Sequence, residues 1–276
     1  MMDYETLWHR LTPFYETSEA KAIVRWVLEV RFGLSMADIL CGKVNELSAT
    51  DQKDLEDIMQ RLEKGEPVQY IIGVADFCGR QFYVAPGVLI PRPETEELCR
   101  WIVEKSGDKT CILDIGTGSG CIAITLALEI PDATVAAWDI ADEAVQIAQK
   151  NAKTLGANVH FERQDILNSP PDACYDLIVS NPPYIQPKES DGMAKNVLDY
   201  EPHQALFTPD DQPIIFYQRI GDFAWQHLKT GGSLYFELNP LTAHEVSDYL
   251  HQLGFSEIEI RQDQFGKQRF LKATKI

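Results

Sequence analysis

The sequence predicts an α/β protein in which a doubly wound, mostly parallel sheet follows a small helical domain. From residue 110 onward, strand-like and helix-like patterns alternate along the chain, which is typical of a parallel sheet with helices on both faces. Residues 1–75 carry only helical patterns, and a stretch interrupted by Gly and Pro, residues 76–93, separates the two regions. We therefore expect a helical domain (1–75), a β-hairpin connector (76–93) and an α/β domain (94–276).

The helical domain is predicted from two amphipathic segments. Residues 18–33 place their apolar side chains on one stripe with the helical period, and the pattern ends at Gly33. Residues 54–67 repeat the pattern and end at Gly65 and Pro67. Stripes of this kind normally form a buried core, so no catalytic group is assigned to this domain.

The α/β domain is predicted element by element from the period of its apolar residues. The connector before it has short aromatic and β-branched runs that are broken by Gly and Pro, which favours a hairpin. The predicted strands are 110–116, 134–140, 158–165, 175–181, 233–239, 255–261 and 268–274. The predicted helices are 120–130, 142–156, 213–232 and 241–254.

Composition limits the classes of partner. The chain has 42 acidic and 25 basic residues and a net charge of -17, which should repel nucleic acid and acidic membranes, although the charge could also serve solubility alone. Six cysteines without a CxxC pair indicate reduced thiols and no metal site. The N-terminus lacks the pattern of a signal peptide, and no apolar run approaches the ~20 residues of a membrane span. We expect a cytoplasmic, monomeric protein without a metal.

A glycine loop follows the first predicted strand of the sheet. Glycines occupy positions 116, 118 and 120, with Thr117 and Ser119 between them, and should let backbone amides approach a ligand at the start of the next helix. A dinucleotide fingerprint would need a third glycine at position 121, where this chain has Cys121. The observed GxGxG spacing after an acid is typical of S-adenosylmethionine sites, and a tight structural turn is the alternative.

Two further strand ends carry acidic residues that suit a nucleoside. Asp139 ends the second predicted strand, where its carboxylate could accept hydrogen bonds from both ribose hydroxyls. Capping of the following helix is the alternative role, and Asp142 could perform it equally well. Asp165 ends the third predicted strand beside Ile166, where an adenine base should pack, although an aspartate is common in any turn.

The sequence Asn181-Pro182-Pro183-Tyr184 follows the fourth predicted strand. This strand should lie beside the first, so the turn should face the reactive end of the ligand. The two prolines hold backbone carbonyls outward, and the Asn181 side chain adds a second acceptor for one –NH₂ group. Tyr184 could cover a planar substrate group by stacking. A purely structural double-proline turn is the alternative.

Further motifs make the chain resemble a known family, the release factor glutamine N5-methyltransferases of the PrmC/HemK type. They are PVQYIIG at 67–73, VLIPRPETEEL at 88–98, YEPHQAL at 200–206 and GKQRFLKA at 266–273. The resemblance covers almost the whole chain. One departure is Gln212-Pro213, where such proteins usually have Asp-Gly.

The resemblance implies a Rossmann-like methyltransferase domain with a seven-stranded sheet, and S-adenosylmethionine as cofactor. It implies that Gly116–Gly120, Asp139, Ile166 and Asn181 contact this cofactor. It also implies that Asn181–Tyr184 hold the substrate, the glutamine of the Gly-Gly-Gln motif of peptide-chain release factors. Since the chemical site is complete without residues 1–75, this domain is expected to recognise the protein substrate.

Two other functions remain open at this point. A DNA or RNA amino-methyltransferase could use the same Asn-Pro-Pro-Tyr turn, but it would need a positive channel and a means of base extrusion. The net charge of -17 argues against it. A non-catalytic adaptor that binds the cofactor and a partner protein is the second alternative, and the intact turn argues against it.

Overall fold

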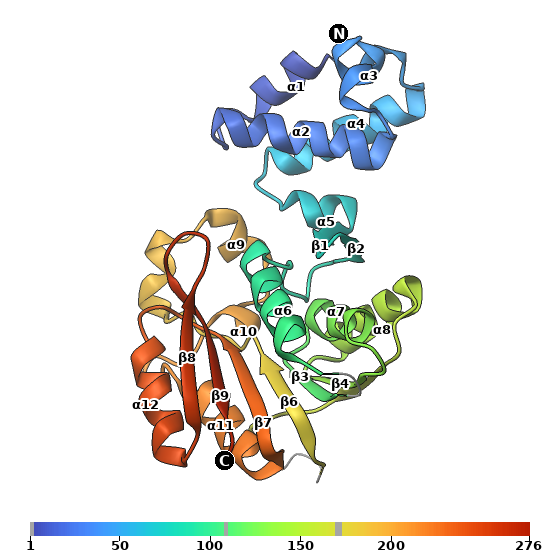
Figure 1. Ribbon diagram of the computed structural model, residues 1–276. Helices are drawn as coiled ribbons and strands as arrows, with labels where there is room; N and C mark the ends of the chain where they lie inside the picture. Colours follow the sequence, from blue (N-terminus) through green and yellow to red (C-terminus); the bar gives the residue numbers. More distant parts are fainter. Residues whose placement is uncertain (1–2, 108–109, 169–172) are drawn as a thin grey trace. The chain divides into compact units, whose positions relative to one another are not determined.

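The computed structural model describes residues 3–107, 110–168 and 173–276 (Figure 1). The chain forms two compact units. The first contains Met1–Val74 together with Ala194–Tyr200, and the second contains Ala75–Met193 and Glu201–Ile276.

The first unit is helical, as the amphipathic segments predict. Its helices are α1 (Tyr4–Leu11), α2 (Thr17–Phe32), α3 (Met36–Leu40), η1 (Lys43–Glu46, a 3₁₀ helix), α4 (Ala49–Leu62), α5 (Val68–Ile72) and α9 (Lys195–Tyr200). The stripe of α4 is fully buried, and Gly33 ends α2 in the left-handed conformation with φ 67°. The membership of α9 was not predicted, and the Tyr200 hydroxyl of this helix donates to the Lys64 carbonyl over 3.2 Å.

The connector forms the predicted hairpin, from β1 (Val74–Phe77) and β2 (Arg80–Tyr83). Asn151 fixes the hairpin to the sheet domain. The side-chain oxygen of Asn151 accepts from the Tyr83 amide over 2.7 Å, and its Nδ2 donates to the Tyr83 and Ser119 carbonyls over 2.9 Å each. One buried amide therefore holds the hairpin against the glycine loop.

A seven-stranded sheet forms the centre of the second unit, and the predicted fold is confirmed. The strands are β3 (Cys111–Ile115), β4 (Thr134–Asp139), β5 (Val159–Arg163), β6 (Tyr175–Ser180), β7 (Leu228–Glu237), β8 (Ser256–Gln262) and β9 (Gln268–Thr274). Their order is β5-β4-β3-β6-β7-β9-β8. The first five run parallel, whereas β9 is antiparallel to both of its neighbours. As predicted, β6 lies beside β3.

Helices cover both faces of the sheet (Figure 1). On one face lie α6 (Pro93–Lys105), α7 (Cys121–Glu129) and α8 (Asp142–Leu155), and on the other lie α11 (Ile215–His227) and α12 (Ala243–Leu253). Two short elements, η2 (Pro187–Gly192) and α10 (His203–Leu206), follow β6. Each face has its own apolar cluster, which includes Ile124 on one face and Tyr217 on the other.

The predicted helix 213–232 is wrong after His227. From Leu228 the chain is strand β7, because Leu228 pairs with Tyr175 and the Gly231 amide donates to the Lys275 carbonyl over 2.7 Å. Before this helix, Gln212 lies in a turn in which its amide donates to the Pro209 carbonyl over 3.1 Å. None of the helices in the described ranges combines the length and the apolar character of a membrane-spanning segment.

Candidate active site

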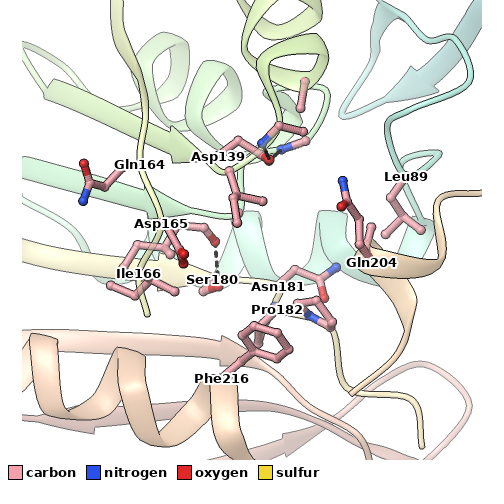
Figure 2. Close-up of a pocket in the computed structure, with 18 of the residues that line it drawn as sticks. Leu89, Asp139, Gln164, Asp165, Ile166, Ser180, Asn181, Pro182, Gln204 and Phe216 are labelled. Atoms are coloured by element: carbon pink, nitrogen blue, oxygen red, sulfur yellow. Dashed lines mark hydrogen bonds between the residues drawn. The ribbon is translucent and has the colours of Figure 1, made fainter. Parts of the chain in front are cut away.

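A cavity lies at the carboxyl ends of β3, β4 and β6, where the strand order reverses. This position is where open α/β sheets bind their ligands. The cavity measures about 240 Å³ (Figure 2). It is lined by Gly87, Val88, Leu89, Ile115, Gly116, Gly118, Asp139, Ile140, Ala141, Ala144, Gln164, Asp165, Ile166, Leu167, Ser180, Asn181, Pro182, Pro183, Gln204, Ala205, Phe216 and Ile220.

The glycine loop reaches the cavity through Gly116 and Gly118. Both have positive φ, at 75° and 55°, and a Cβ atom at either position would meet no protein atom within 4 Å. The amides of residues 116, 117, 118 and 120 all donate to oxygens within the protein. These four N–H groups are therefore engaged within the protein, and Gly116 and Gly118 leave room for close approach of a ligand to the backbone.

The other three loop residues do not line the cavity. Gly120 precedes α7 with φ 81°, and a Cβ there would lie 2.9 Å from Ile124 Cδ1 and 3.0 Å from Ala148 Cβ. Ser119 is buried, and the Thr117 hydroxyl donates over 2.6 Å to the Asp114 carboxylate beneath the loop. These residues shape the loop, so their predicted cofactor contacts stay predictions.

Asp114 is a buried acid for which the sequence predicts no role. Its Oδ2 accepts from the Thr117 hydroxyl and, over 3.2 Å, from the Ala123 amide. Its Oδ1 has no hydrogen-bond partner among the described residues. Burial is the largest influence and raises the pKa of Asp114 to about 7. The acid before the glycines was visible in the motif, but its burial was not.

Asp139 ends β4 and faces the cavity (Figure 2). Its carboxylate accepts from the Gly118 amide over 2.8 Å and from the Ala141 amide over 3.0 Å. Burial raises the pKa of Asp139, and these hydrogen bonds oppose that rise. Asp139 is not the N-cap residue of α8. The helix begins at Asp142, its N-cap residue is Ala141, and no side chain caps it.

Asp165 and Ile166 line the same cavity from the segment after β5. The strand ends at Arg163, so Asp165 lies in a turn rather than at the strand end. The Asp165 carboxylate accepts from the Leu167 amide over 2.9 Å and from the Asn168 side chain over 2.6 Å. Leu167 is 45% exposed and Ile140 is 50% exposed, although both line the cavity. Leu167 and Ile140 therefore present apolar surface to the cavity beside Asp165 and Ile166.

The turn after β6 brings Asn181, Pro182 and Pro183 to the cavity. The buried Ser180 hydroxyl fixes the strand end by donating to the Ile115 carbonyl over 2.6 Å. Figure 2 shows Asn181 and Pro182 around the same cavity as Gln204, Phe216 and Leu89.

Tyr184 is not part of the cavity lining. The Tyr184 hydroxyl donates to Glu237 Oε1 over 3.0 Å, and Arg269 Nη1 lies 3.5 Å from the same hydroxyl. Burial, and then the neighbouring Glu237 carboxylate, raise the pKa of Tyr184. The structure therefore places this residue as an anchor of the turn, and stacking on a substrate stays a prediction.

Several lining residues had no predicted role. Leu89 and Gln204 belong to motifs that carried the family resemblance, so a signal for them existed, whereas Gln164 and Phe216 carried none. The two motifs are joined by the buried Glu201. Its carboxylate accepts from the Ile90 amide over 3.1 Å and from Arg92 Nη2 over 2.5 Å. One acid thus holds two walls of the cavity together.

In the described part of the chain, no group of three or more His, Cys, Asp or Glu residues could hold a metal ion. All six cysteines are free.

Two family models match separate parts of the chain. Residues 9–73 match the family described as the PrmC N-terminal domain, and residues 95–207 match the Methyltransferase small domain. A structure of a methyltransferase from Pyrococcus furiosus aligns over 80% of this chain and 98% of its own, with a TM-score of 0.56 at 18% identity. That likeness shows the fold.

Relatives with higher sequence identity show more than the fold. A release factor glutamine methyltransferase from Bacteroides thetaiotaomicron is 47% identical over 267 residues, which are 96% of each chain. The protein of the same name from Flavobacterium psychrophilum is 38% identical over 96% of this chain and 95% of its own. This chain therefore belongs to the release factor glutamine methyltransferase family.

Proposed function

We propose that this protein transfers a methyl group from S-adenosylmethionine to the side-chain amide nitrogen, N5, of a glutamine in a peptide-chain release factor. The substrate glutamine is that of the Gly-Gly-Gln motif. One observation carries the proposal: the glycine loop, Asp139 and the Asn181-Pro182 turn meet at one cavity in a chain 47% identical to a release factor glutamine methyltransferase.

The residues of the cavity fit the cofactor. Gly116 and Gly118 leave open space where a side chain would stand. The Asp139 carboxylate can still accept from hydroxyls, because two backbone amides occupy only part of its acceptor capacity. Ile140, Ile166 and Leu167 provide apolar surface on which the planar adenine base of the cofactor can pack. When bound, S-adenosylmethionine supplies an activated methyl group on a sulfonium sulfur.

The turn residues would orient the acceptor nitrogen. An amide nitrogen is a weak nucleophile because its lone pair is delocalised into the carbonyl. Acceptors at Asn181 Oδ1 and at a backbone carbonyl of the turn would bind the two hydrogens of the –NH₂ group. Positive charge develops on that nitrogen during transfer, so these acceptors stabilise the transition state more than the ground state. The methylated amide is acidic enough to lose a proton to water, and no general base is assigned.

The net charge of -17 disfavours direct nucleic-acid binding. We propose that the release factor is the partner and that a monomer binds it in the cytoplasm. The experiment that tests the function is incubation with labelled S-adenosylmethionine and a purified release factor, followed by mapping of the methylated residue. A release factor with alanine in place of the glutamine is the control. Label on the alanine form at the same level would contradict the proposal.

The cofactor role of Asp139 can be tested separately. Asp139→Ala should weaken S-adenosylmethionine binding by ~1–3 kcal/mol, the range for losing a hydrogen bond to a charged group. Isothermal calorimetry measures this, and Asp142→Ala is a matched control because Asp142 is exposed and outside the cavity lining. Equal affinities in wild type and Asp139→Ala would remove the ribose role. Because Asp139 also holds the Gly118 amide, thermal unfolding should be recorded for each variant.

The role of the first unit gives another prediction. A chain that starts at Ala75 keeps both apolar clusters of the sheet domain and should still bind the cofactor. It should methylate the intact release factor poorly, since we propose that the first unit binds that protein. In the shortened chain, α9 lacks the rest of the unit to which it belongs. Cofactor binding is therefore the control that shows whether the shortened chain folds. Full activity on the intact release factor would show that the first unit has a different role.

A further inference from the structure

A buried carboxylate lies behind the catalytic turn. Glu237 ends β7 and is only 2% exposed. Its Oε2 accepts from the Thr95 hydroxyl over 2.6 Å, and its Oε1 accepts from the Tyr184 hydroxyl over 3.0 Å. Thr95 is on α6 and Tyr184 closes the Asn-Pro-Pro-Tyr turn. One acid therefore connects the strand end, the helix and the turn.

The surroundings of Glu237 can support an ionised carboxylate. Arg269 is a nearby cation: its Nη1 lies 3.5 Å from the Tyr184 hydroxyl and 3.2 Å from the Leu238 carbonyl. The Arg269 guanidinium favours the charged form of Glu237, as do both hydroxyl donors. An ionised carboxylate has only acceptors. It therefore fixes the direction of both hydroxyl hydrogens toward itself.

The direction of the Thr95 hydroxyl decides what Thr95 can offer to Asn181. Because its only hydrogen points at Glu237, the Thr95 oxygen presents lone pairs on its remaining side. The group of Asn181 that faces Thr95 must then be its –NH₂, and Nδ2 indeed lies 3.4 Å from Thr95 Oγ1. The opposite orientation would set the Asn181 oxygen against the lone pairs of Thr95. The Asn181 oxygen is thereby the end left for another partner.

We propose that Glu237 is a positioning residue that acts through Thr95 to orient the Asn181 amide, so that the Asn181 oxygen accepts from the substrate –NH₂ group. This inference rests on the proposed function, because it assigns the use of the Asn181 oxygen. Glu237 and Thr95 do not line the cavity. Their effect is exerted through the direction of hydrogen bonds, from Asn181 to Thr95 to Glu237.

A glutamine at position 237 keeps the shape of the side chain and can reverse this direction, because one of its two ends is an –NH₂ group that donates instead of accepting. Its –NH₂ group can donate to Thr95, which can then donate to the Asn181 oxygen. The Asn181 amide would rotate and present hydrogens to the substrate –NH₂, which repel it. Glu237→Gln should therefore lower single-turnover methylation by about 10²-fold, the lower end for loss of one preorganised hydrogen-bonding group. S-adenosylmethionine affinity should stay within about twofold.

Three further variants separate orientation from general packing. Thr95→Val removes the hydroxyl at similar volume and should also lower turnover strongly, whereas Thr95→Ser keeps the hydroxyl and should retain most of it. Glu104→Gln is the matched control for loss of one charge, because Glu104 is exposed on the same helix α6. Rates are measured at saturating cofactor and release factor, with thermal unfolding recorded for each variant.

A pH profile provides a readout that a packing role would not alter. Burial is the largest influence on Glu237 and raises its pKa; Thr95, Tyr184 and Arg269 oppose the rise, and Glu94 adds to it. Protonation of Glu237 would reverse the hydrogen bonds as glutamine does, so wild-type turnover should fall as the pH drops through this raised pKa. Glu237→Gln should lack that decline. Asp114 and Asp139 also have raised pKa values. Both residues are present in wild type and in Glu237→Gln, so their effect on the pH profile is the same in the two proteins.

The orientation itself can be observed without a substrate. The ¹⁵N side-chain resonance of Asn181, assigned from its absence in Asn181→Asp, should shift in Glu237→Gln and Thr95→Val and stay in place in Glu104→Gln. Unshifted resonances, or Glu237→Gln turnover within threefold of wild type, would overturn the inference. Failure of the wild type to methylate any release factor glutamine would instead overturn the proposed function. The resonances would still test the direction of the hydrogen bonds from Asn181 through Thr95 to Glu237. If Glu237→Gln does not fold, the Thr95 pair gives the same test.

Discussion

Asn181→Ala is expected to lower the rate of methyl transfer by about 10²–10³-fold, the typical cost of losing one preorganised hydrogen-bonding group at a reacting centre. The reason is positional. Without the Asn181 oxygen, the substrate –NH₂ group keeps one acceptor and can rotate, so its nitrogen seldom meets the methyl group in line. Cofactor binding should change far less than turnover, although Asn181 lines the cavity.

The measurement is single-turnover methylation of a release factor with saturating cofactor. Asn181→Asp is the informative companion, because a carboxylate still accepts from the substrate. It cannot donate to Thr95, however, so we expect a rate between those of wild type and Asn181→Ala. An alanine variant within threefold of wild type would mean that the turn is a structural support rather than part of the reaction.

Gly120→Ala is expected to destabilise the protein by about 2–5 kcal/mol, combining two costs. A left-handed backbone at φ 81° costs an alanine ~1–2 kcal/mol. The added Cβ would also lie 2.9 Å from Ile124 Cδ1 and 3.0 Å from Ala148 Cβ, and overpacking of this kind costs ~1–3 kcal/mol. Denaturant unfolding measures the sum.

A second glycine separates the two costs. Gly156 ends α8 with φ 73°, and a Cβ there would meet no protein atom within 4 Å. Gly156→Ala should therefore lose only the ~1–2 kcal/mol of the backbone cost. Equal destabilisation by the two substitutions would show that the packing of α7 on α8 relaxes freely around the new methyl group.

The sheet domain was predictable because its signals are local. Buried strands and amphipathic helices have different periods, and the rule for parallel connections restricts the possible strand orders. The placement of β6 beside β3 followed from these rules, and with it the meeting of Asn181 and the glycine loop at one sheet edge. The end of α11 was missed because residues 228–232 owe their strand conformation to pairing with distant segments.

The polar network of the site was not predictable, because it joins residues far apart in the sequence. Thr95 and Glu237 are separated by 142 positions, and Glu201 meets Ile90 across 111. No local period places such pairs together. The motifs containing Thr95 and Glu201 were recognised as patterns, whereas the direction of their hydrogen bonds depends on packing that only the folded chain provides.

The membership of α9 in the first unit affects how the protein can be made. Synthesis is vectorial, and N-terminal regions generally begin to fold while the rest of the chain is still being translated. Residues 3–74 can form their apolar cluster early, but the Tyr200 hydroxyl that contacts Lys64 leaves the ribosome only after β3 to β6 have emerged. The first unit is thus the first to start folding, and it is completed only after most of the parallel strands of the second have been synthesised.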